Sequence, residues 1–226
     1  KTDIQADAIL ITQIEGFVAT PTPAVALGMR LVETSDPPRV LWMGTVSRSA
    51  DQSPGAFEQG VVRDFPELQA RALDEIIDHL GAFLAGSQSP AASCQGERRF
   101  EPQTFYRSPD FSFSGDHTLA VLPFLSHASR HLAGQAVANS LMREFHATPG
   151  FIVMEPGVIR EELLRRRVVL AGGVSLDMAR LLFETLNVDL IVAGTVFEYT
   201  DSTPGTGAPA VSFSTTLLDR RSTPVV

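Results

Sequence analysis

Apolar residues alternate with small or polar residues along two stretches of the chain, one near each end. The alternating positions are Val25, Leu27, Met29 and Leu31 in the first stretch, and Val211, Phe213, Thr215 and Leu217 in the second. Because residues two apart share one face of a strand, this pattern predicts two half-buried β-strands. Such alternation is typical of antiparallel sheet that packs one face on helices and keeps the other nearer to solvent.

The same two regions form a weak internal repeat. Residues 6–17 (ADAILITQIEGF) align with residues 188–199 (VDLIVAGTVFEY) at an offset of 182, and residues 23–40 align with residues 209–226 at an offset of 186. Each copy predicts a strand, a loop rich in proline and threonine, a second strand, a tight polar turn and a third strand. The repeat indicates two copies of one supersecondary unit, which bears on the fold more strongly than local propensity does.

Helical and strand patterns fill the region between the copies. Apolar residues at helical spacing predict four helices, at Asp64–Leu84, Gly134–Phe145, Val158–Arg166 and Leu176–Leu186. The first begins with Asp64 as N-cap and Pro66 in its first turn, and Ser175 and Asn187 bound the last. Short apolar runs at residues 118–125 and 151–154 predict two more strands, the first of them central and covered on both faces.

These elements predict an α+β fold made of two related units. Residues 86–103 are rich in small and polar residues and predict a linker. We therefore expect the later part of a first unit at residues 1–85 and a second unit at residues 104–226. The second unit has the order β-α-β-α-α-β-β-β, which predicts a mixed sheet backed by helices on one face.

Several segments of the second unit resemble a known group of proteins. They are AVLPF at Ala120–Phe124, FIVMEPGVIREELL at Phe151–Leu164, VDLIVAGTVFEYTD at Val188–Asp201 and VSFSTTLLDRRSTPVV at Val211–Val226. These segments are similar to the superfamily that contains the curli-secretion lipoprotein CsgG, the penicillin-binding-protein activator LpoB and the N-terminal domain of TolB. The resemblance covers residues 104–226, and residues 1–85 resemble the later part of the same domain, without its opening strand and helices.

The resemblance implies a location and a class of function. It implies the bacterial periplasm, usually with a lipid tether to the outer membrane, and a role in envelope assembly rather than catalysis. It supplies no catalytic, cofactor or metal residues. The chain begins at Lys1 without a methionine, so a lipid anchor that gave peripheral outer-membrane association would lie upstream of it.

Composition and charge exclude several other classes. The chain has 226 residues, of which 44% are hydrophobic and 19% are charged, so it is neither largely disordered nor fibrous. The formal net charge of -8 provides no protein-wide positive field for nucleic acid or anionic lipid. The apolar runs are shorter than the roughly 20 residues of a membrane-spanning helix.

Three features are candidates for reactive or ligand-binding sites. Cys94 is the only cysteine, and we interpret it as a thiol in the linker rather than a lipidation site. His127 and His131 are spaced for one helical face, but with no third ligand nearby they are interpreted as surface residues at a helix start. Gly172 and Gly173 lack the remainder of a phosphate-binding motif, which favours an ordinary loop.

Structural roles are also favoured at the other notable side chains. Arg165, Arg166 and Arg167 complement a helix C-terminus, although they would suit a lipid headgroup or an acidic partner. Trp42 is expected to pack under the first helix rather than form an interface anchor. Asp7 and Asp189 recur at strand starts, which fits a turn-stabilising hydrogen bond better than acid–base catalysis.

The sequence therefore predicts a non-enzymatic periplasmic envelope protein that acts as a binding or assembly scaffold and forms a ring or another complex. Its expected partners are envelope proteins or further copies of itself, and no cofactor is expected. A soluble subunit of a secretion or motility apparatus stays open as an alternative of the same class. A small-ligand sensor or an unrecognised hydrolase stays open as an alternative of a different class.

Overall fold

A computed structural model of the chain describes residues 6–19, 22–35, 38–50, 64–87, 103–109, 111–130, 132–168, 174–200 and 209–226. The chain divides into two compact units, Lys1–Arg99 and Phe100–Val226. Most of the predicted linker at residues 86–103 lies outside the described residues.

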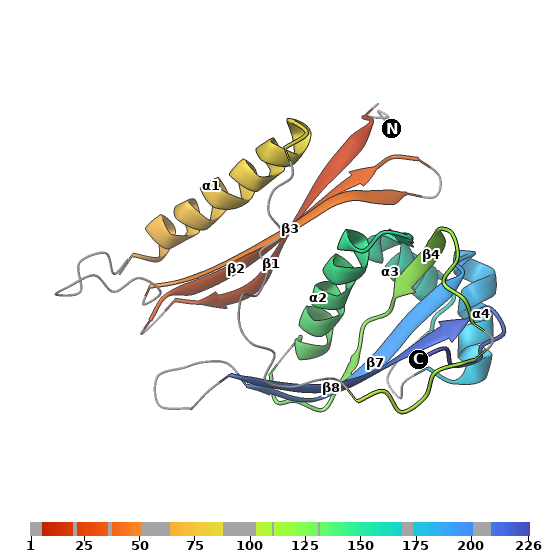
Figure 1. The fold of residues 1–226 in the computed structure, drawn as a ribbon. Coiled ribbons are helices and arrows are strands. Elements are labelled where there is room, and N and C mark those ends of the chain that lie inside the picture. The colour runs from red at the N-terminus through yellow and green to blue at the C-terminus, as the bar shows by residue number, and fades with distance from the viewer. Residues whose placement is uncertain are drawn as a thin grey trace. The chain divides into compact units, whose positions relative to one another are not determined.

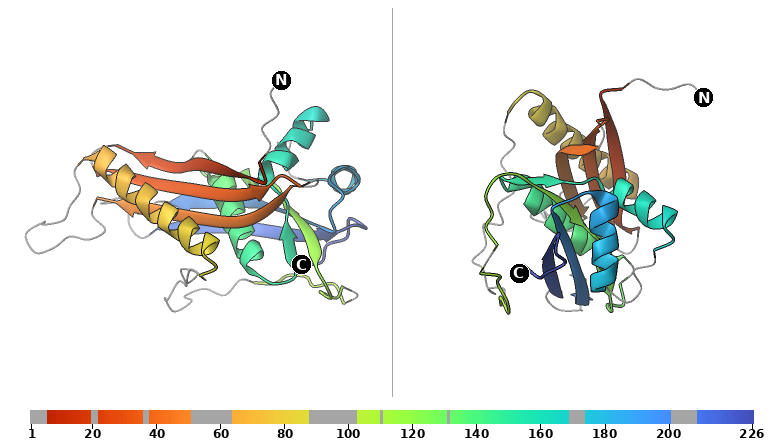
Figure 2. Two further views of the ribbon diagram at one scale, coloured as in Figure 1. Left: turned by 90° about the horizontal axis from the view of Figure 1, so that it is seen from above. Right: turned by 90° about the vertical axis from the view of Figure 1, so that its right-hand side faces the viewer.

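The first unit is an antiparallel sheet with a helix on one face (Figure 1). Its strands β1 (Ala8–Val18), β2 (Ala24–Glu33) and β3 (Arg39–Ser49) lie in the order β1-β2-β3. Helix α1 (Phe65–Leu84) has Asp64 at its N-cap and proline in its first turn, as the sequence predicted. The helix packs on β2 and β3, and Figure 2 shows it running across the sheet.

The core of the first unit lies between α1 and the alternating face of β2. Its buried members are Val25, Leu27, Met29, Trp42, Val46, Leu68, Ala72 and Ile76. The apolar residues at every second position of β2 and those at helical spacing on α1 therefore pack against each other in one apolar layer.

The second unit is a mixed sheet with three helices. Its elements are β4 (His117–Val121), β5 (Leu125–Ser126), α2 (Ala133–Ala147), β6 (Phe151–Val153), α3 (Pro156–Arg165), α4 (Leu176–Leu186), β7 (Leu190–Thr200) and β8 (Ala210–Asp219). β4 and β5 pair with successive parts of β7, so the strand predicted at residues 118–125 forms in two pieces along one edge. Across the sheet the order is thus β6, then β4 with β5, then β7, then β8. Only β8 is antiparallel to its neighbour.

Helices cover both faces of this sheet, which corrects the expectation of helices on one face. Ala120 and Ile191 belong to the cluster that α3 and α4 cover. On the opposite face, Phe151 of β6 contacts Phe145 of α2 at 5.1 Å between ring centroids. The physical reason is the apolar run in β4, since adjacent residues point to opposite faces and both Leu119 and Ala120 are fully buried.

The hairpins β1–β2 and β7–β8 have the same pairing register. Ala8 pairs with Glu33 in the first, and Leu190 pairs with Asp219 in the second. The register shifts between Ile14 and Gly16 in β1, and between Val196 and Glu198 in β7. These residues are related by the offsets of 182 and 186 found in the sequence, so the aligned residues occupy equivalent ladder positions, including the β-bulge.

The third strand expected after β8 does not form. Beyond the turn at Asp219 only a single bridge, between Leu218 and Pro224, continues the sheet. Val225 N–H donates to the carbonyl of Leu217, and the carbonyl of Val225 accepts from the Ser108 N–H. After the turn the chain returns beside Leu217 through the bonds of Val225 and Val226, so residues 220–226 add one bridge rather than a strand. None of the helices in the described part of the chain has the length and apolarity needed to cross a bilayer.

Candidate functional site

The outer edge of β8 is the first candidate for a functional surface. At the end of this strand Leu217 directs both its N–H and its carbonyl outward, to Val226 and Val225. Because backbone groups alternate in direction along a strand, Val211, Phe213 and Thr215 direct theirs outward as well. Among the described residues, no strand pairs with this side of Val211–Thr215. We call residues Val211–Thr215 the β8 edge.

The side chains of the β8 edge are exposed, which corrects the prediction of a half-buried strand. Phe213 is 41% exposed, whereas Leu27, its equivalent in β2, is 2% exposed. In the first unit β3 pairs with β2 and α1 covers both strands. The described part of the second unit supplies no equivalent of β3 or α1 over the β8 edge. The alternation along β8 therefore indicates a face that is suited to burial, although none of the described elements buries it.

An open hollow lies beside this edge on the α4 side of the sheet. It has a volume of about 300 Å³ and is lined mainly by small and apolar residues, with hydroxyls from Thr195, Ser214 and Thr216. Leu125 lines it from the β5 side, and Leu176 lines it from the start of α4. None of the described residues that line it carries a charged side chain. A site of this kind accepts an apolar side chain more readily than a charged ligand.

The β8 edge also lacks the features that protect exposed strands from pairing. Residues 210–218 contain no charged residue and no proline. Exposed edge strands are ordinarily blocked by lysine, proline or a bulge that turns the edge away. The bulge of this hairpin lies in β7 rather than in β8. The backbone of Val211–Thr215 can therefore accept another strand.

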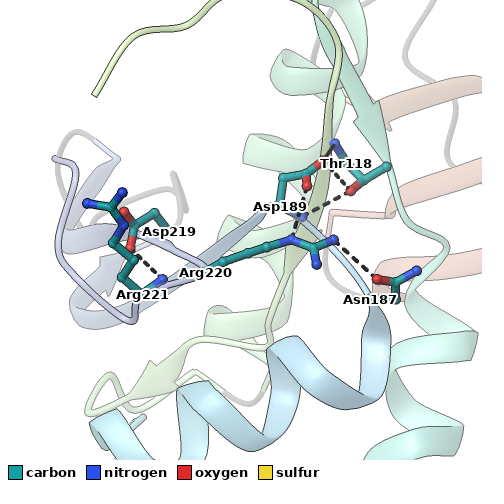
Figure 3. A network of polar contacts seen from close by, with 6 residues as sticks. All are labelled: Thr118, Asn187, Asp189, Asp219, Arg220 and Arg221. Carbon is teal, nitrogen blue, oxygen red and sulfur yellow. Dashed lines mark hydrogen bonds and ion pairs between the residues drawn. The ribbon is translucent and has the colours of Figure 1, made fainter. Parts of the chain in front are cut away.

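Asp189 is the centre of a polar network at the opposite end of this hairpin (Figure 3). Its carboxylate accepts hydrogen bonds from the Thr118 N–H at 2.9 Å and the Thr118 hydroxyl at 2.8 Å. The Arg220 Nε donates to the other carboxylate oxygen at 3.1 Å, and its guanidinium also donates to the Asn187 side chain. The network ties the starts of β4 and β7 to the turn after β8.

The charge of Asp189 is stabilised by these contacts. Burial raises the pKa of its carboxyl, but the hydrogen bonds from Thr118 and the attraction of the Arg220 guanidinium outweigh burial, so the pKa is lowered. A carboxylate held in the ionised form by several donors is a poor proton donor at neutral pH. This is the hydrogen-bonding role that the sequence favoured for Asp189. At Asp7 the carbonyl, rather than the side chain, accepts from Thr34.

The structure also places several of the other residues singled out in the sequence. Trp42 is buried on β3 and contacts Phe83 of α1 at 6.3 Å between ring centroids, as expected of a residue under this helix. His127 follows β5 and stacks on Phe197, so it does not lie at a helix start. Arg165 ends α3, where it forms ion pairs with Glu161 and Glu162.

The remaining candidates fall outside the described residues. These are Cys94, His131, Gly172 and Gly173. Within the described ranges, no three or more histidine, cysteine, aspartate or glutamate side chains are grouped so as to hold a metal ion.

Sequence reasoning identified the strand β8 but missed its open edge. The available signal was the absence of charged residues and proline from the alternating strand at residues 210–218. Composition of this kind could have indicated a strand that needs a partner.

No protein-family model matches the sequence, and no curated protein matches it. Among solved structures, the lipoprotein GNA1162 from Neisseria meningitidis is 20% identical, with a TM-score of 0.40 over 49% of this chain and 75% of that one. The LpoB C-terminal domain from Salmonella enterica is 9% identical, with a TM-score of 0.38 over 50% of this chain and 79% of that one. The hypothetical protein CT253 from Chlamydia trachomatis is 15% identical, with a TM-score of 0.31 over 47% and 64% of the two chains. The chain is thus similar, over about half of its length, to solved bacterial proteins that include a lipoprotein.

Proposed function

We propose that this protein is a non-enzymatic binding or assembly module of the bacterial cell envelope, located in the periplasm. It binds an envelope protein by adding an extended segment of that protein to the β8 edge. The location rests on the resemblance of residues 104–226 to the superfamily of CsgG, LpoB and the TolB N-terminal domain. The mode of binding rests on one observation, the uncharged edge at Val211–Thr215, which no strand of the described residues pairs with.

The first unit indicates what such a partner would resemble. There, β3 pairs antiparallel with β2 and places Trp42 and Val46 on the buried face. We therefore propose an antiparallel partner strand with apolar residues at alternate positions. Main-chain hydrogen bonds would supply affinity, and the side chains on either face of the strand would supply specificity. The equal registers of the two hairpins support the related proposal that the units are tandem copies, with boundaries near residues 85 and 104.

The hollow beside the edge favours a protein partner over a small ligand. Ligand pockets enclose about 70–90% of the ligand surface and direct several polar groups at it. Here the lining is open, and its polar side chains are three hydroxyls. An apolar side chain of an added strand would fit this lining. A small-ligand sensor is consequently the less supported alternative.

Photo-crosslinking in the native cell tests the proposal. A photoreactive phenylalanine analogue replaces Phe213 in one variant and Leu164 of α3 in the control, since both side chains are exposed. We expect an adduct with an envelope protein from position 213 and none from position 164. Val211→Pro removes one outward N–H and should abolish the adduct, whereas Val211→Thr keeps the N–H and should retain it.

Two results would contradict this function. Equal adducts from positions 213 and 164 would indicate random encounter. An adduct that survives Val211→Pro would show that strand addition is not the mode of contact. Circular dichroism of each variant checks that β8 still folds.

A further inference from the structure

In the described part of the first unit, the outer edge of β1 is a second strand edge without a pairing partner, and it is distinct from the β8 edge. The carbonyl of Asp7 accepts from Thr34 beside β2, so alternation directs the backbone groups of Leu10, Thr12 and Ile14 away from β2. Among the described residues β1 pairs with β2 alone. The equivalent side of β7 is paired with β4 and β5. Among the described residues, therefore, the outer edge of the first hairpin strand is paired in the second unit, at β7, and unpaired in the first unit, at β1.

The open edge of β1 carries large apolar side chains on the face that α1 occupies. Leu10 and Ile14 lie opposite Leu31 and Leu27, which belong to that face. Phe17 contacts Phe65 of α1 edge-on at 4.7 Å. Ile14 and Phe17 are 61% and 60% exposed, and Leu10 is exposed as well. We call Leu10, Ile14 and Phe17 the β1 strip.

Helix α1 lies beside the β1 strip only at its start. Phe65, the first residue of the helix, contacts Phe17, whereas Phe83 near its end contacts Trp42 of β3. The helix therefore crosses the sheet from β1 toward β3. Among the described residues, the β1 strip is left as an exposed apolar surface beside a strand edge that pairs with no other strand.

We propose that this surface binds a second copy of the chain, with β1 of one copy antiparallel to β1 of its partner about a two-fold axis at Thr12. This register pairs Leu10 with Ile14 of the partner subunit, and Ile14 with Leu10 of the partner subunit. Thr12 lies opposite Thr12 of the partner subunit. Apolar and threonine pairs of this kind are favourable across antiparallel strands.

Three observations support a copy of the same chain as the occupant. The outward residues are spaced symmetrically about Thr12, as a two-fold contact requires. The segment Leu10–Ile14 carries no charge, so the central pairs of the two strands bring no like charges together, although the chain as a whole has a net charge of -8. The two-fold axis leaves both α1 helices on one face of the joined sheet, so the β1 strips of the two copies lie next to each other on that face.

The β1 strip supplies part of the area that a dimer needs. The exposed parts of Leu10, Ile14 and Phe17 amount to roughly 300 Å² per copy, with the strand backbone and neighbouring side chains in addition. A standard interface takes about 800 Å² from each partner. Pairing of β1 with β1 would also form a continuous six-stranded sheet and remove this open edge from both copies.

Cysteine crosslinking tests the register directly. In a Cys94→Ser background, Thr12→Cys places two thiols opposite each other, where paired Cα atoms lie about 5.5 Å apart and a disulfide is geometrically allowed. We expect a covalent dimer on mild oxidation. Gln13→Cys on the same strand is the matched control, because it would lie diagonally from its copy and should crosslink at least tenfold more slowly.

A second measurement avoids covalent chemistry. Ile14→Lys places a charge in the β1 strip and should raise the dimer dissociation constant more than tenfold, measured by light scattering over a range of concentrations. Leu164→Lys, on exposed α3, should leave the dissociation constant unchanged. Because Ile14 is largely exposed, circular dichroism should show both variants folded.

Other outcomes would overturn the proposal. A monomer at all concentrations, with no Thr12→Cys crosslink, would mean that another part of the same chain covers β1. A covalent dimer from Thr215→Cys, and none from Thr12→Cys, would assign self-association to the β8 edge. A crosslink only in a mixture of Thr12→Cys and Thr215→Cys proteins would indicate head-to-tail contact. Each result is separate from the photo-crosslinking at position 213, so the two proposals can fail independently.

Discussion

Replacing Asp189 by asparagine should destabilise the second unit in a pH-dependent way. The substitution keeps the shape of the side chain and one oxygen, which can still accept from the Thr118 N–H. It removes the negative charge and turns an NH₂ group toward either Arg220 or the Thr118 hydroxyl. The polar network in Figure 3 therefore loses its charge and at least one of its hydrogen bonds.

The magnitude follows from those contacts and from the exposure of the carboxylate. A hydrogen bond to a charged group contributes about 1.5–3 kcal/mol when it is well buried. The side chain of Asp189 is 38% exposed, so solvent screening reduces that figure. We expect Asp189→Asn to lower the free energy of unfolding by about 1–2 kcal/mol at pH 7.

The pH dependence has a definite sign. An ordinary aspartate has a pKa of about 3.9. In the folded protein the pKa of Asp189 is lower than this ordinary value. Its contribution to stability is therefore fully present above that ordinary value and is lost as pH falls through the folded pKa. The difference in free energy of unfolding between wild type and Asp189→Asn should be constant from pH 7 to about pH 5 and should close toward pH 2.

Urea unfolding followed by far-UV circular dichroism measures this difference across the pH range. Trp42 is the only tryptophan, so its fluorescence reports the first unit separately and should show no shift. Asp177→Asn is the control, because Asp177 pairs with Arg180 in an almost fully exposed position in the first turn of α4 and its loss should cost no more than about 0.5 kcal/mol. A deficit in Asp189→Asn that persists unchanged at low pH would refute the role assigned to the carboxylate charge.

Two further predictions concern packing. Gly194→Ala would direct a methyl group into the Phe124 ring and the Ser214 carbonyl, and should cost about 1–3 kcal/mol, whereas Gly81→Ala in α1 meets no atom within 4 Å and should stabilise its unit by about 0.5–1 kcal/mol. Denaturant titration of both variants checks this pair, and equal effects would contradict the packing argument. Trp42→Ala removes a ring that is 7% exposed and should cost about 3–5 kcal/mol. Thermal unfolding by circular dichroism tests it, and a loss below 1 kcal/mol would mean that the ring is not part of the core.

Much of the secondary structure was predictable because its signals are local. The helix at Leu176–Leu186 has the predicted bounds, since Ser175 caps its N-terminus with a side-chain hydrogen bond and Asn187 ends it in the left-handed conformation. The repeat offsets also predicted which residues of the two hairpins occupy equivalent ladder positions. The register of a hairpin depends on the length of its turn and on the apolar pattern of its strands, and residues close together in the sequence determine both.

The structure decided what covers each strand. Leu27 and Phe213 occupy equivalent positions in similar strands, yet one is buried and the other exposed, because β3 and α1 follow the first hairpin and nothing equivalent in the described residues follows the second. The alternation of apolar and polar residues along a strand indicates only that one face is suited to burial. Whether that face is buried depends on elements distant in sequence, so the tertiary structure established the open edges of β8 and β1 on which the proposed binding roles rest.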